Sequence, residues 1–117
     1  MNIESLREYC LSLKGTTEGF PFDEETLVFK VGGKMFALTS LGGPLSVNLK
    51  CDPEKAIELR ENFPQVVPGY HMNKKHWNTV TIDDSIPDTL IQEWIDDSYW
   101  LVVASLPRKV RTEIESN

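Results

Sequence analysis

The sequence predicts one α+β domain in which an antiparallel β-sheet is flanked by helices, in the order α-β-β-β-α-β-α. Two β-rich runs, 27–31 and 34–39, are separated by Gly32-Gly33, which indicates a tight hairpin because both central residues of a type I′ turn need φ > 0. Helical periodicity marks both ends of the chain. A length of 117 residues, of which 40% are hydrophobic, suits a single core. We therefore expect one domain over residues 1–117, with its strands sandwiched between helices.

The amino-terminal half begins with a helix that we predict over Ile3–Leu13. Its apolar residues recur at spacings of three and four, and Asn2 precedes them as a cap. The polar stretch Thr16–Glu25 is assigned no helix or strand. Leu45–Lys50 alternates strictly between apolar and polar residues, which predicts a third strand with its apolar residues facing the core.

The carboxyl-terminal half is predicted to hold a second helix, a fourth strand and a long last helix. The second helix, over Pro53–Glu61, begins where a capping Asp52, a proline at the first helical position and an acid at the positive end of the dipole coincide. Trp77–Ile82 is the predicted strand. Pro87 opens the long helix, and the basic run at 108–111 continues as a further helical segment. The apolar stripe of the long helix comprises Leu90, Ile91, Trp94, Ile95, Ser98, Leu101 and Val102.

Composition indicates an ordinary soluble globular protein. No apolar run approaches the roughly 20 residues that a membrane helix needs, and the first residues lack the basic then apolar order of a signal peptide. We expect a cytoplasmic monomer with no membrane partner. Cys10 and Cys51 lie far apart in the chain, so we expect buried or half-buried free thiols and neither a disulfide nor a metal clip.

Chemically distinctive residues are concentrated in Pro68–Val80. This segment holds both histidines of the chain, two adjacent lysines, a Trp and a Tyr, and it contains no acid. It lies within an acid-free window over residues 62–82, whereas the whole chain has a net charge of −6. This segregation of charge indicates a surface that meets an anionic or an aromatic partner.

The rings and lysines of this segment admit simpler explanations as well. Trp77 could stack on a base or another flat ligand, or it could fill the edge of the core. Lys74 and Lys75 could be solvated residues of a turn. His71 and His76 are two ligands without a third nearby, so we predict no metal site.

Catalytic arrangements are not evident. The paired carboxylates Asp83-Asp84 and Asp96-Asp97 are adjacent in sequence and would point apart, so they cannot flank one bond. The glycine pairs lack the frame of a phosphate-binding loop. Cys51 precedes a helix, which favours a thiolate, but the adjacent Asp52 opposes it. We expect a protein that is not an enzyme and that needs no cofactor.

Five runs of residues carry a resemblance to a known family. They are Phe20-Pro21-Phe22, 31–37, 49–54, 68–77 and 98–102. In these runs the chain resembles the MmcQ/YjbR-like family of small bacterial proteins, most specifically where Pro-Gly-Tyr-His, a basic pair and His-Trp follow one another. The resemblance implies a compact α+β fold of the double-wing, CyaY-like kind and a role in DNA binding. One departure is Asp23, where many relatives carry glycine.

DNA binding would require the basic residues to converge. A DNA-binding domain usually has a basic face and a pI above about 9, because phosphate neutralisation supplies most non-specific affinity. The sequence pI here is about 4.8. We expect salt-sensitive binding to DNA if the cations share a face, and a protein- or small-ligand-binding domain otherwise. The candidate contact residues are Lys34, Tyr70, His71, Asn73, Lys74, Lys75, His76, Trp77, Asn78, Arg108, Lys109 and Arg111.

Overall fold

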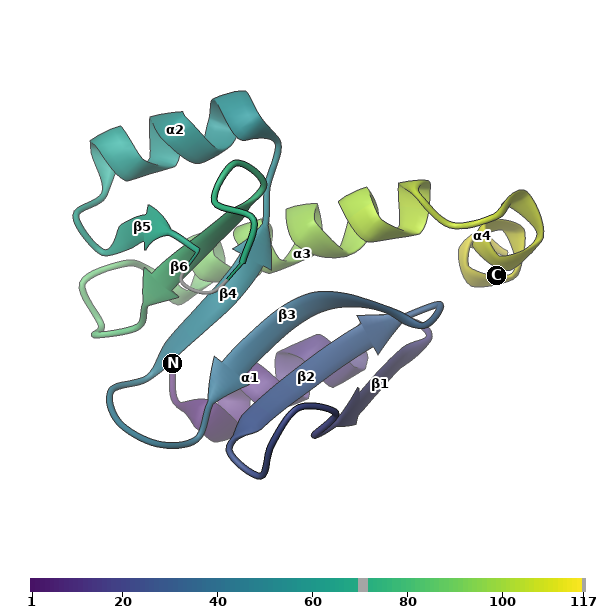
Figure 1. Ribbon diagram of the computed structural model, residues 1–117, viewed down its shortest axis with the longest axis horizontal. Coiled ribbons are helices and arrows are strands. Elements are labelled where there is room, and N and C mark those ends of the chain that lie inside the picture. Colours follow the sequence, from purple (N-terminus) through teal and green to yellow (C-terminus); the bar gives the residue numbers. More distant parts are fainter. Residues whose placement is uncertain (70–71, 117) are drawn as a thin grey trace.

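The structure is a computed structural model that describes residues 1–69 and 72–116 (Figure 1). Within these residues six antiparallel strands form one sheet in the order β1-β2-β3-β4-β6-β5. The strands are β1 (Thr16–Gly19), β2 (Thr26–Val31), β3 (Lys34–Ser40), β4 (Ser46–Lys50), β5 (Val66–Pro68) and β6 (Trp77–Thr81). The helices are α1 (Ile3–Ser12), α2 (Pro53–Asn62), α3 (Asp88–Ala104) and α4 (Arg108–Glu115). None of these helices has both the length and the apolar character that a bilayer crossing requires.

The helices pack on one face of the sheet. In Figure 1, α1 and α3 lie behind the strands. The core contains Leu6 of α1 and Ile95 of α3 together with inward strand residues such as Phe29 and Val47, and Leu59 of α2 packs against it. The α+β class and the antiparallel sheet are confirmed, but the expected sandwich of strands between helices is wrong. We call the face opposite α1 and α3, which no helix of the described chain covers, the open face.

Local signals placed the caps and the hairpin correctly. The Asn2 side chain accepts a hydrogen bond from the Ser5 backbone amide at 2.8 Å, and the Ser5 hydroxyl accepts one from the Asn2 amide at 2.9 Å. Gly32 and Gly33 have φ values of 58° and 81°. Asp52 caps α2 as predicted. These devices depend on neighbours in sequence, which explains why the sequence alone revealed them.

Two short edge strands were not predicted. β1 lies in the polar stretch after α1 and pairs with β2, with Thr16 opposite Val31. β5 has three residues and pairs with β6, with Val66 opposite Val80. Strands this short have no alternation of their own to detect, so their pairing depends on the strand beside them.

The buried stripe of α3 is rotated from the predicted one. It centres on Ile95 and Val102, so Tyr99 and Val103 are buried while Leu101 is 38% exposed. The prediction that Leu101 faces the core is wrong, because that residue falls at the edge of the stripe. The helix is also fastened to the centre of the sheet by a polar contact of Ser98.

Gly32→Ala is expected to destabilise the protein more than Gly33→Ala. Both residues have positive φ, so a side chain costs roughly 1–2 kcal/mol at either position. A Cβ on Gly32 would lie 2.6 Å from Cδ1 of the buried Leu106, whereas one on Gly33 meets nothing within 4 Å. We expect Gly32→Ala to lower the free energy of unfolding by about 1–3 kcal/mol more, measured by urea denaturation. If both variants lose the same free energy of unfolding, the Leu106 side chain accommodates the new Cβ without an energetic cost, which would contradict this account.

Ser98→Ala is expected to lower the free energy of unfolding by about 1–3 kcal/mol. The fully buried Ser98 hydroxyl donates to the Phe36 carbonyl of β3 at 2.5 Å and accepts from the Lys50 amide of β4 at 2.9 Å. The substitution leaves both backbone groups without this partner. Ser12→Ala, at an exposed serine of α1, is the control and should change stability by less than about 0.5 kcal/mol. A Ser98→Ala protein as stable as the control variant would contradict this account.

Candidate functional site

Strand side chains form rows across the open face, because antiparallel register places residues of neighbouring strands opposite one another. The central row consists of Val28, Leu38, Asn48, Thr79 and Val67. On one side of it lies a row of hydroxyl side chains, Thr26, Ser40, Ser46 and Thr81. Neither row contains an acid, although acids outnumber bases in the chain by 18 to 12.

The row on the other side of the central row is basic. Lys30 lies opposite Met35, and Lys50 lies opposite Trp77. A bulge after Met35, at Phe36, lets Met35 face outward while Phe36 stays in the core. We call Lys30, Met35, Lys50 and Trp77 the lysine row. Trp77 is half-buried and shares the side of β6 that faces away from the core residue Val80, so it does not fill the core edge.

A groove of about 720 Å³ lies over the open face. Its lining includes Phe22, Met35, Leu38, Met72, Asn48 and Thr79. The Thr79 hydroxyl donates to Asn48 Oδ1 at 2.5 Å, which holds the Asn48 amide in one orientation within the groove. The volume is within the range of about 300–1,000 Å³ typical of small-ligand sites. The groove is therefore large enough to hold a flat ring system.

Asp23 brings one negative charge to the groove. It lies at the end marked by Thr26, away from the lysine row. Its carboxylate accepts hydrogen bonds from the backbone amides of Glu25 and Thr26 at 2.9 and 2.7 Å and from the Thr26 hydroxyl at 3.2 Å. These bonds hold the pKa of Asp23 below its ordinary value, so this end of the groove carries a negative charge at neutral pH. The other end adjoins the lysine row through Met35, although neither Lys30 nor Lys50 lines the groove.

The described residues just before β6, 73–76, form a braced turn. The Gly69 amide donates to the Trp77 carbonyl at 2.7 Å, and a Cβ at Gly69 would lie 2.8 Å from the Trp77 Cβ. Asn73 accepts from the Lys75 amide through its side chain at 3.0 Å and from the Trp77 amide through its carbonyl at 2.9 Å. Lys74 is exposed on the same turn, so both lysines project into solvent from a braced backbone.

Arg60 of α2 anchors this turn from the side. Its Nε donates to Asn78 Oδ1 at 2.7 Å, and its terminal nitrogen donates to the carbonyls of Lys74 and, at 3.4 Å, Trp77. All three acceptors are uncharged groups. The guanidinium thus fixes the turn that bears Lys74 and Lys75 and adds a positive charge beside it.

The basic residues do not form one cluster. Lys34 lies at the start of β3, with Nζ 3.4 Å from the Ser105 carbonyl, next to α4. Arg108 and Lys109 are exposed on α4, and Arg111 pairs there with Glu115 at 3.5 Å. Figure 1 shows α4 at one end of the molecule, beyond the turn between β2 and β3, whereas the turn anchored by Arg60 lies near α2. The candidate cations therefore fall into two separate groups.

The other predicted contact residues have different outcomes. Tyr70 and His71 lie outside the residues that the structure describes. His76 is half-buried, and its carbonyl accepts from the Cys51 amide at 2.7 Å. Asn78 is 2% exposed and uses its side chain within the fold, bonding Arg60 and, at 3.4 Å, the Ala56 carbonyl. The Asn78 side chain stabilises the packing of α2 against the turn and does not lie on the open face.

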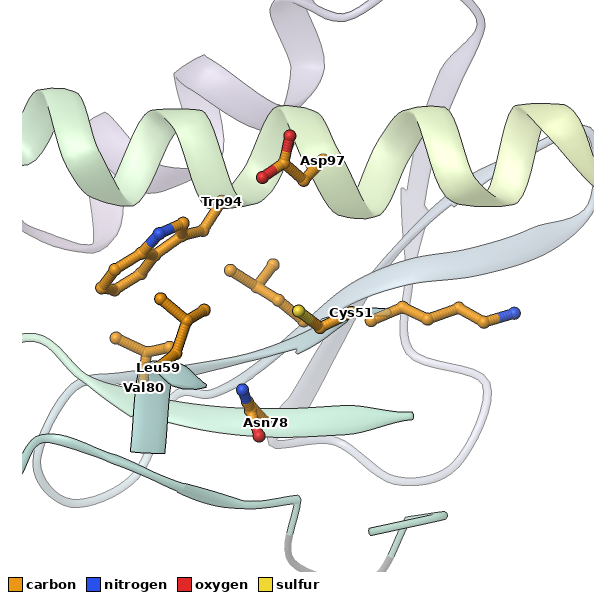
Figure 2. A pocket seen from close by; sticks show the side chains of 8 residues that line it. Cys51, Leu59, Asn78, Val80, Trp94 and Asp97 are labelled. Atoms are coloured by element: carbon orange, nitrogen blue, oxygen red, sulfur yellow. The ribbon is translucent and has the colours of Figure 1, made fainter. Parts of the chain in front are cut away.

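A second pocket, between the sheet and α3, is too small for a ligand. Figure 2 shows Cys51, Asn78, Trp94 and Asp97 around it. Its volume of about 10 Å³ has room for about one water molecule. The groove on the open face is consequently the better candidate for binding.

Neither cysteine is set up for reaction. Burial raises the pKa of the Cys10 thiol to about 12 and also raises the pKa of Cys51, so both stay protonated near neutral pH. The expectation of buried free thiols is confirmed. In the part of the chain that the structure describes, no three His, Cys, Asp or Glu side chains are grouped as metal ligands would be.

Sequence reasoning missed Lys30, Lys50, Arg60, Phe22 and Asn48. The two lysines had a detectable signal, since each occupies an outward position of an alternating strand. The groove residues had none, because sheet register and the loops beside it bring them together. Arg60 resembled any exposed helix residue until its partners were known.

The family profile of YjbR matches residues 11–101 of the chain. Among curated proteins, YbdF of Escherichia coli O157:H7 is 41% identical over 107 residues, which cover 91% of this chain and 88% of that protein. YjbR of Escherichia coli strain K12 is 36% identical over 112 residues, which cover 95% of each chain.

Solved structures agree with the sequence relatives. The crystal structure of DR2400 from Deinococcus radiodurans, described as a DUF419 domain, is 46% identical with a TM-score of 0.90, over 97% of this chain and 87% of that one. A crystal structure from Pseudomonas syringae is 28% identical with a TM-score of 0.76, over 86% of this chain and 98% of that one. Because the profile and these relatives cover most of its length, the chain belongs to the YjbR family.

Proposed function

We propose that this protein binds DNA without catalysing a reaction, and that it does so through the open face and the adjoining turn of Lys74 and Lys75. The observation that supports this most is the distribution of charge. In a chain with a net charge of −6, the strand residues of the open face include Lys30 and Lys50 and no acid. A local cationic surface can attract phosphates although the whole molecule is acidic, because solvent screens distant charges.

The contact set differs from the one expected from sequence alone. Lys30, Lys50, Lys74 and Lys75 supply the phosphate contacts, and the α4 group is left out. Four such contacts correspond to a slope of about −3 to −4 in log K against log salt. We also propose that the fold is of the double-wing kind and that the protein is located in the cytoplasm. It acts there without an enzyme activity and without a cofactor.

Charge reversal tests the proposed surface. Lys74→Glu/Lys75→Glu and Lys30→Glu/Lys50→Glu should each weaken binding of a labelled oligonucleotide at least about 10-fold at roughly 50 mM salt, because each removes two phosphate contacts and adds two repulsions. Arg108→Glu/Lys109→Glu changes the net charge equally from α4 and should weaken binding less than about 3-fold. Fluorescence anisotropy measures all of them.

The Arg108→Glu/Lys109→Glu control distinguishes binding through a local surface from binding that depends on the net charge of the protein. If the α4 variant loses as much affinity as the others, binding follows overall charge and the proposed surface is wrong. If the parent protein shows no measurable affinity at this salt concentration, DNA binding itself is refuted.

Arg60→Lys is expected to weaken DNA binding about 3- to 10-fold although it keeps the positive charge. A lysine cannot reproduce the fork that bonds Asn78 and the carbonyl of Lys74, so the turn of Lys74 and Lys75 loses its anchor. Amide exchange of residues 73–77 should quicken in the same variant. Unchanged affinity together with quickened exchange would show that the turn need not be held for binding.

A protein- or small-ligand-binding domain is the second candidate. The groove of about 720 Å³, with Phe22, Met35 and Met72 in its lining, supports it. Apolar contacts weaken little with salt, so binding of a partner that persists at high salt and is lost in Phe22→Ala would favour this candidate over DNA.

A further inference from the structure

We infer that the DNA bound by this protein is single-stranded, and that one unpaired base is seated in the groove of the open face. This inference rests on the proposed function and specifies its ligand. Three features lead to it: the width of the face, the direction of its charge and the chemistry of the groove.

The open face is too wide for a groove of duplex DNA. Its central part spans β2, β3, β4 and β6, which at about 4.8 Å per strand spacing measures roughly 14 Å before side chains are added. The major groove of B-DNA is about 12 Å wide and admits one helix or a two-stranded ribbon. A surface of this width cannot read bases there. Val28 and Leu38 of its central row are buried, so the outward side chains of Lys30, Asn48 and Lys50 are the ones that can contact a single strand laid across it.

Along the strands of the open face, the charge changes from positive at the lysine row to negative at Asp23. Lys30 and Lys50 lie on β2 and β4, two strand spacings or roughly 10 Å apart, in the row on one side of the groove. Asp23 lies at the opposite end and repels phosphate there. A bound strand therefore has its phosphates over the lysine row, and its bases turn toward the central row.

The groove offers a base both a stacking surface and a hydrogen-bond donor. Phe22 is 62% exposed and lines the groove together with the flexible side chains of Met35 and Met72, which can adapt to a flat ring. The bond from the Thr79 hydroxyl to Asn48 Oδ1 orients the Asn48 amide, whose nitrogen is its hydrogen-bond donor and can donate to a base. Stacked bases of a duplex could not enter this site without leaving their partners.

The experiment compares labelled single-stranded and duplex oligonucleotides of equal length and equal salt concentration. The parent protein should bind the single strand at least about 10-fold more tightly. Phe22→Ala should weaken single-strand binding about 10-fold, as expected for the loss of one stacked base. Phe20→Ala is the matched control, because Phe20 is also exposed (48%) in the same loop but does not line the groove. Circular dichroism verifies that both variants are folded.

The outcomes separate this inference from the proposal on which it rests. Duplex binding as tight as single-strand binding, still weakened by Lys74→Glu/Lys75→Glu, would refute the single-strand inference and leave DNA binding in place. A preference for single strands that is equal in Phe22→Ala and Phe20→Ala would refute the seated base. Failure of both probes to bind would remove the proposed function itself.

Discussion

The packing of α3 against the centre of the sheet is the interaction on which the rest of the structure depends. Its buried stripe covers β3 and β4, and the Ser98 hydroxyl bonds a carbonyl of one strand and an amide of the other. With α1 and α2 on the same side, most of the large apolar strand residues, such as Phe29, Val47 and Val80, point toward one face. Because side chains alternate along each strand, the residues between them point to the other face, which contacts water. On that face the strands carry hydroxyl, amide and lysine side chains and no carboxylates.

The sequence predicted those parts of the fold that depend on near neighbours. Asn2, Asp52 and the pair Gly32-Gly33 act through bonds or dihedral angles within a few residues, so their patterns were sufficient. The edge strands β1 and β5 were missed because their structure comes from the strand beside them. The one-sided arrangement of helices was missed for a related reason: the apolar stripe of a helix shows that it packs on something, but not on which face of the sheet.

The candidate site was predicted in part. Charge segregation in Pro68–Val80 identified the turn of Lys74 and Lys75, because that signal is continuous in sequence. The remaining cations of the open face come from strands that are distant in sequence and meet through register, and α4 proved to lie elsewhere. A count of basic residues could not separate the two groups. The periodicity of the strands could have indicated Lys30 and Lys50, had outward positions been compared for charge.

The acidic remainder of the molecule limits what can bind to this face. α2 exposes Glu58 and Glu61 within two residues of Arg60, which anchors the turn, so a polyanion that extends past the turn toward α2 meets repulsion. Added salt weakens that repulsion as well as the attraction to the lysines, which makes the net salt dependence smaller than a count of lysines suggests. A short segment that crosses the sheet avoids the acids, whereas a long rigid duplex has less freedom to do so. The same charges that make the chain acidic thus favour a flexible, locally bound strand over a polyanion that spreads across the surface.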